Sequence, residues 1–228
     1  MAITVGTTAS QEDTSPTTVT LAVTCNGVDR YLGVFVGGFI ASGDPAPSSA
    51  TYAGVDLTPI FSHITFGAGS QFWMFGYRLV NPASGTNNLV INFTATPNRS
   101  FTGAIPMEGV NQVTPDSGTG TEAVGESGTA SIAVPSAVGS LVWDGMISFW
   151  VAGANVGADQ IQRWQIADLG EGVTGAGSTE PGAAPNVTMS WTRIGAIENS
   201  WGIGGISVNP AADSGIVFTS LPLLGVGR

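Results

Sequence analysis

Alternation of apolar and polar side chains, with a period of two residues, is the feature that most constrains how this chain can fold. Residues 18–25 place Val19, Leu21 and Val23 on one face and small polar side chains on the other. This period is typical of a strand buried on one face, whereas an amphipathic helix repeats every ~3.6 residues. No stretch of the sequence shows a sustained helical period. The chain is therefore predicted to be all-β, with little or no helix.

Glycine and proline separate the apolar runs and indicate the domain organisation. The 228 residues include 33 Gly and 13 Pro, which mark turns because the periodicity survives between them. We expect a single jelly-roll-like β-sandwich of about a dozen antiparallel strands over residues 17–210. An N-terminal arm, 1–16, and a C-terminal tail or edge strand, 211–228, flank it. The length suits one large domain better than two small ones, and no fixed-period repeat is visible.

One predicted strand, residues 71–80, is apolar on both faces. The first face carries Trp73, Phe75, Tyr77 and Leu79. The second face carries Phe72 and Met74 together with Arg78. Such a strand is either central in the fold, or has its second face covered by a partner subunit.

The segment that follows Pro210 is strongly apolar, whereas a frayed chain end is normally polar. It either adds an edge strand to its own sheet or docks on a neighbouring molecule. We predict that both ends of the chain and the second face of strand 71–80 contribute to an interface. The candidate interface residues are Ile3, Val5, Phe72, Met74, Ile216, Phe218, Leu221, Leu223 and Leu224.

The composition leaves few groups for catalysis or for metal binding. There is one His, one Cys and no Lys, and 16 acidic residues against six Arg give a net charge of −10. A negative surface is repelled by nucleic-acid phosphates and by anionic lipid, so we expect neither nucleic acid nor membrane as a partner. No His/Cys cluster suits zinc, and no Asp-rich loop suits calcium. We expect no cofactor, with calcium on scattered carboxylates as an open alternative.

Glu108 and Asp144 are the only acidic residues inside apolar strand runs. A β-sandwich glycosidase would need two carboxylates facing each other across a cleft, and no motif pairs two acids on one strand. His63 is the only base for a Ser-His-Asp triad, and no G-x-S-x-G motif is present. We predict that the chain is not an enzyme, with glycoside hydrolysis as the alternative to be tested.

The tryptophans raise the question of a sugar-binding surface. Four of them lie in runs of period two, so burial in the core is the expected state. Two or more exposed on one sheet face would instead favour carbohydrate binding. These residues are Trp150, Trp164, Trp191 and Trp201.

Several motifs occur in an order that resembles a known domain. ATYAGVDLT at 50–58 resembles an xVTYGGxxLT element, YRLVNPASGTN at 77–87 resembles WYLxNPPAGTN, and GVNQVTP at 109–115 resembles GVxQxTP. LVWD at 141–144, QIQRW at 160–164 and VTMSW at 187–191 follow in the expected order. Together they resemble the jelly-roll-type β-sandwich domain of tailed-bacteriophage virion proteins and of some bacterial surface proteins.

The resemblance implies a structural virion protein. We expect a capsid decoration (cement) protein that stabilises the head by binding between capsid subunits, made in the host cytoplasm and assembled on the particle exterior. Its expected partners are the major capsid protein and further copies of itself, as a homotrimer. Because a fold does not fix a function, a carbohydrate- or receptor-binding module of a tail or head fibre, with a surface glycan as partner, is the alternative.

Overall fold

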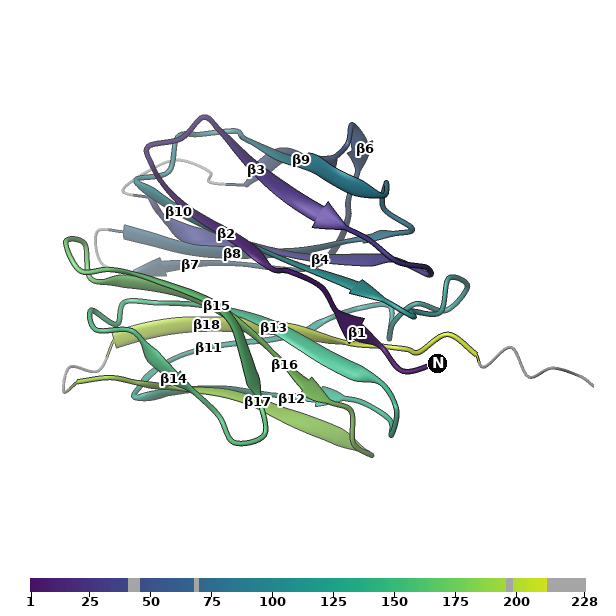
Figure 1. Ribbon diagram of the computed structural model, residues 1–228. Coiled ribbons are helices and arrows are strands. Elements are labelled where there is room, and N and C mark those ends of the chain that lie inside the picture. The colour runs from purple at the N-terminus through teal and green to yellow at the C-terminus, as the bar shows by residue number, and fades with distance from the viewer. Residues whose placement is uncertain (41–45, 68–69, 196–198, 213–228) are drawn as a thin grey trace, which may run out of the picture.

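The computed structural model describes residues 1–40, 46–67, 70–195 and 199–212. These residues form 18 strands in four antiparallel sheets and contain no helix. The prediction of an all-β chain is therefore confirmed. The prediction of a single sandwich is not, because the four sheets stack one on another as successive layers (Figure 1).

The first two sheets come from the N-terminal half of the chain. Its strands are β1 (Thr4–Val5), β2 (Ala9–Thr14), β3 (Thr18–Cys25), β4 (Tyr31–Ile40), β5 (Pro47–Tyr52), β6 (Val55–Asp56), β7 (Thr58–Gly67), β8 (Ser70–Val80), β9 (Gly85–Phe93) and β10 (Arg99–Glu108). The larger sheet has the order β1-β10-β4-β8-β7, and β2 also pairs with β10. The smaller sheet has the order β3-β9-β5-β6. The predicted N-terminal arm therefore adds strands to the chain's own sheet.

The other two sheets come from the C-terminal half. Its strands are β11 (Thr121–Ser127), β12 (Thr129–Pro135), β13 (Leu141–Ser148), β14 (Ala154–Val156), β15 (Ile161–Asp168), β16 (Val173–Pro181), β17 (Asn186–Arg193) and β18 (Asn199–Val208). The larger sheet has the order β11-β18-β13-β16-β15, and the smaller sheet has the order β12-β17-β14.

The two halves repeat one topology, and we call residues 9–108 the first repeat and residues 121–208 the second repeat. The order β11-β18-β13-β16-β15 corresponds strand by strand to β2-β10-β4-β8-β7, and β12-β17-β14 corresponds to β3-β9-β5. A shift in strand register precedes Phe61 in β7, and an equivalent shift precedes Trp164 in β15. The sequence does not predict this duplication.

The larger sheets of the two repeats face each other in the middle of the molecule (Figure 1). Their contacts are reciprocal, because each contact of one strand pair is repeated by the equivalent pair. Strand β8 contacts β18, and the equivalent strands β16 and β10 are also in contact. In the same way β7 contacts β11 and β15 contacts β2, while the equivalent strands β4 and β13 contact each other. This is the pattern of a two-fold symmetric interface between identical subunits, here formed within one chain.

Glycine on one repeat faces a large side chain on the other. Near the centre, a Cβ on Gly33 would lie 2.7 Å from the Trp143 ring, and a Cβ on Gly145 would lie 2.1 Å from the Phe35 ring. Further out, Phe61 packs over Gly204. The equivalent residue of the second repeat, Trp164, packs over Gly103 in the same way. Each large ring thus fills a recess that only glycine leaves open.

Strand β8 shows how the layers divide the apolar residues. Trp73 and Tyr77 belong to the core inside the first repeat, whereas Phe72 and Met74 belong to the core between the repeats. The alternation predicted for residues 71–80 is therefore confirmed. The second face of β8 is covered by the chain's own second repeat.

A polar network also joins the repeats at the side of the stack. Arg99 of β10 donates hydrogen bonds from Nε to Asp168 Oδ2, 2.7 Å away, and from Nη1 to Thr14 Oγ1, 2.6 Å away. Glu12 lies within ion-pair distance of the same guanidinium, at 3.2 Å. The hydrogen bond from Arg99 is the main cause that lowers the pKa of the Asp168 carboxyl below its ordinary value.

Candidate functional site

The structure places the candidate interface residues in three different settings. Ile3 and Val5 are half-buried and pack against the core between the repeats. Phe72 and Met74 are buried in that same core, so neither is on the surface. The remaining five, Ile216, Phe218, Leu221, Leu223 and Leu224, lie outside the described residues.

The two candidate catalytic acids lie in different repeats, Glu108 in the first and Asp144 in the second. Asp144 is fully buried in the second repeat, where its Oδ1 accepts hydrogen bonds of 2.7 Å from both Ser178 N and Ser178 Oγ. Its Oδ2 accepts one of 2.8 Å from Trp191 Nε1. Burial raises the pKa of Asp144 to about 6, although these hydrogen bonds oppose the rise. A carboxylate enclosed in this way holds two sheets together and does not face a substrate.

The four tryptophans considered as a sugar platform are all buried. Trp150 and Trp191 lie inside the second repeat, and so does Trp201, which is only 8% exposed. Trp164 lies between the repeats. Core packing, the expected state, is therefore confirmed for all four, and they form no exposed platform.

His63, the only candidate base, lies on the surface of β7. Its Nδ1 is 3.4 Å from Oε1 of Glu122 on β11, so it joins the edges of the two larger sheets. Among the described residues, no group of three or more His, Cys, Asp and Glu side chains is arranged to hold a metal ion. Nor does any described helix have the length and apolar character needed to cross a membrane.

One end of the molecule gathers exposed apolar side chains, and we call it the terminal face. Its members are Met1, Val28, Val113 and Val138, of which Val113 is 90% exposed and Val138 is 85% exposed. Backbone hydrogen bonds bring their segments together: Met1 N donates to Ala211 O, Gly109 N to Val28 O, and Asn111 N to Asn209 O. Val138 lies in the turn before β13, whose first residue pairs with the last residue of β18. The chain leaves the described region at this end (Figure 1).

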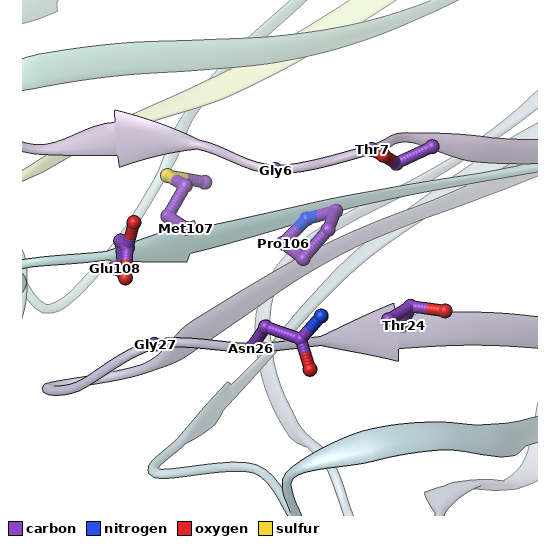
Figure 2. Close-up of a pocket in the computed structure, with 8 residues that line it drawn as sticks. All are labelled: Gly6, Thr7, Thr24, Asn26, Gly27, Pro106, Met107 and Glu108. Atoms are coloured by element: carbon purple, nitrogen blue, oxygen red, sulfur yellow. The ribbon is translucent and has the colours of Figure 1, made fainter.

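A small pocket of about 210 Å³ lies beside Val28 at this end. Figure 2 shows that three segments form it, namely the link between β1 and β2, the end of β3 and the end of β10. Its polar lining consists of Thr7, Thr24, Asn26 and Glu108. The Glu108 carboxylate makes no hydrogen bond or ion pair with any residue that the structure describes. It is therefore available to a basic group of a partner.

Gly27 shapes this pocket in two ways. Its φ of 82° is a left-handed conformation that favours glycine. A Cβ at this position would also lie 1.5 Å from Glu108 Oε2, so any larger residue would displace the carboxylate. Sequence reasoning singled out Glu108 as a candidate acid but did not place Gly27 beside it.

A larger groove of about 560 Å³ opens on the first repeat, between β5–β6 of the smaller sheet and β7–β8 of the larger sheet. Phe75 and Tyr77 line it, with ring centroids 6.4 Å apart and ring planes inclined by 21°. Exposed Ser48, Asp56 and Ser62 form its polar rim. This combination of aromatic floor and polar rim was not identified from the sequence.

Three comparisons with known proteins give no match: no family model, no curated protein and no solved structure is similar to this chain. The function must therefore be argued from the residues and geometry described above.

Proposed function

We propose that this chain is a structural virion protein of a tailed bacteriophage, and specifically a capsid decoration protein that binds between subunits on the outside of the head. The sequence motifs at 50–58, 77–87 and 109–115 support the virion assignment by resemblance. The proposal assigns no reaction to the chain. In its support, the two candidate acids lie in separate repeats, and one of them is enclosed.

As part of this proposal, each repeat has the architecture of a jelly roll. A jelly roll contains two sheets whose strands alternate along the chain as two Greek keys. In support of this description, strands β2-β10-β4-β8 of the larger sheet and β3-β9-β5-β6 of the smaller sheet follow such an order, and β7 adds a further strand beside β8. The second repeat has the same order without a counterpart of β6. Jelly rolls are common in viral shells, which favours the virion assignment without fixing it.

The terminal face is the observation that carries the proposal. Exposed apolar side chains are ordinary when scattered, but a group of them at one end marks an interaction surface. Val28 lies in the link between β3 and β4 and Val138 in the equivalent link between β12 and β13, so the face spans both repeats. The adjoining pocket offers the Glu108 carboxylate, which has no partner among the described residues, to a Lys or Arg side chain of the capsid partner.

Capsid binding by matched variants tests this surface. Val113→Asp and Val138→Asp place charge on the terminal face and should each weaken binding to undecorated capsids of the parent phage at least tenfold. Leu169→Asp is the control. Leu169 is also exposed, at 70%, but it follows the last residue of β15, at the end of the molecule opposite the terminal face. Sedimentation with capsids, followed by quantitative mass spectrometry, measures the bound fraction.

Equal loss of binding in all three variants, or in none, would contradict docking through the terminal face. Absence of the chain from purified virions by mass spectrometry would contradict the virion assignment as a whole. The homotrimer and the location on the particle exterior belong to the same proposal. Native mass spectrometry of the purified chain tests the first, and protease accessibility of intact virions tests the second.

A further inference from the structure

The groove between β5–β6 and β7–β8 has features that the proposed virion role does not use. Its volume of about 560 Å³ lies within the range of small-molecule sites, about 300–1,000 Å³. The Phe75 ring is half-buried and stacks on Tyr77, while Trp73 continues the aromatic row at 6.1 Å from Phe75. Phe75 and Tyr77 form the aromatic floor of the groove, and Trp73 extends the row into the core.

Tyr77 carries the second, independent observation. The chain has three tyrosines, and the hydroxyls of the other two are bonded: Tyr31 donates to Asp116 Oδ2 and Tyr52 donates to Val23 O. The Tyr77 side chain makes no hydrogen bond with any described residue, although the residue is only 8% exposed. Tyr77 lines the groove and its hydroxyl oxygen is not itself enclosed, so the hydroxyl is open to a ligand that bonds it there. Burial raises the pKa of Tyr77, so the group remains a neutral hydroxyl that both donates and accepts.

The second repeat provides an internal comparison. In the paired strands, Phe75 and Tyr77 occupy the positions that Ala176 and Ser178 occupy in β16. Both of those residues are buried and small, and Ser178 is used to bond Asp144. The topology therefore does not require aromatic residues at these two positions of the first repeat.

The charge of the lining selects the class of ligand. Among the described residues that line the groove, none is basic and Asp56 alone is charged. An anionic ligand would find no counter-charge there. A sugar ring presents a face of C–H groups that packs on the negative face of an aromatic ring, and its hydroxyls bond to groups such as Ser48, Asp56 and Ser62.

We propose that this groove binds a neutral saccharide, with a sugar ring stacked on Phe75 and a sugar hydroxyl bonded to Tyr77. The site is separate from the terminal face, so a chain docked on a capsid would keep the groove free. Binding here does not depend on the virion assignment, and either proposal can fail without the other.

The test begins with a glycan array that carries both neutral and anionic glycans, probed with the full chain. Saturation-transfer NMR with maltose, cellobiose, lactose and chitobiose, and with sialyllactose as the anionic probe, covers weak binding. The best neutral probe is then titrated against three variants. Tyr77→Phe, which removes only the hydroxyl, should weaken binding about tenfold, and Phe75→Leu should weaken it by a similar factor.

Tyr31→Phe is the matched control, since it also removes one tyrosine hydroxyl but away from the groove, and its affinity should equal that of the wild type. Circular dichroism confirms that each variant is folded. Failure to bind any neutral probe at millimolar concentration would overturn the proposal. So would saccharide binding that Tyr77→Phe and Phe75→Leu leave unchanged, or a preference for sialyllactose.

Discussion

Gly145→Ala is the substitution that most directly tests the packing of one repeat against the other. The added methyl carbon would lie 2.1 Å from Cδ2 and 2.3 Å from Cγ of Phe35, whereas carbon atoms in contact are ordinarily ~3.5–4.0 Å apart. Phe35 is 1% exposed and is enclosed by the core between the repeats, so its ring cannot move into solvent. Overpacking of this kind costs about 1–3 kcal/mol of unfolding free energy.

Equilibrium unfolding in guanidinium chloride, with m-values compared, measures the effect. Phe35→Ala removes Cγ and Cδ2, the two atoms nearest to the added methyl carbon, so the cost of the double variant should be smaller than the sum of the single costs by about 1 kcal/mol or more. Gly6→Ala is the control, because its Cβ would meet its nearest atom, Pro106 Cγ, at an ordinary 3.4 Å. Its expected change is within about 0.5 kcal/mol. Wild-type stability of Gly145→Ala, or strict additivity with Phe35→Ala, would refute the facing arrangement of β4 and β13.

Three further substitutions have defined outcomes. The raised pKa of Asp144, about 6, means that the folded state binds its proton more tightly than the unfolded state, so the wild type loses stability as the pH rises toward 6. Asp144→Asn removes this titration. Between pH 5 and pH 7 the unfolding free energy of the variant, measured by chemical unfolding, should therefore rise by about 1 kcal/mol relative to that of the wild type. The pKa of Asp168 is lowered, which has the opposite sign: Asp168→Asn should cost about 1 kcal/mol at pH 7, and this difference should be lost as the pH falls through the lowered pKa of the folded state. A stability difference between variant and wild type that does not change with pH would contradict the pKa shift assigned to the substituted residue. Gly27→Ala should lower the melting temperature more than Gly54→Ala, because both positions have positive φ but only Gly27 contacts Glu108; equal shifts would contradict the role given to that contact.

Period-two alternation predicted the strands and the faces on which their side chains lie, because successive side chains of a pleated strand point to opposite faces of the sheet. Trp73 and Phe72 point into different cores, as the pattern of residues 71–80 requires. The pattern could not say what covers the second face of that strand. An interface between two repeats of one chain has the same apolar chemistry as an interface between subunits.

The duplication was missed for a physical reason that the central contacts make visible. Positions that face each other across the two-fold axis must be complementary and therefore differ between the repeats. Gly33 in one strand corresponds to Trp143 in the other, and Phe35 corresponds to Gly145. Sequence similarity is thus lost at the centre of the interface between the repeats.

The candidate sites were only partly predictable. Glu108 was singled out from the sequence, but its pocket depends on Gly27 and on the N-terminal segment, which the fold brings beside it. Sugar binding was considered for the tryptophans, which are buried because the largest apolar side chains fill the cores. The groove instead joins Phe75 and Tyr77 to rim residues from β5, β6 and β7, and no spacing in the sequence indicates that meeting.

A cryo-electron microscopy reconstruction of capsids decorated with the purified chain tests the central proposal most directly. The proposed function predicts that the stacked sheets stand on the outside of the shell with Val28, Val113 and Val138 against the capsid subunits. Capsids that carry no additional density, or a chain attached by the opposite end near Leu169, would contradict it.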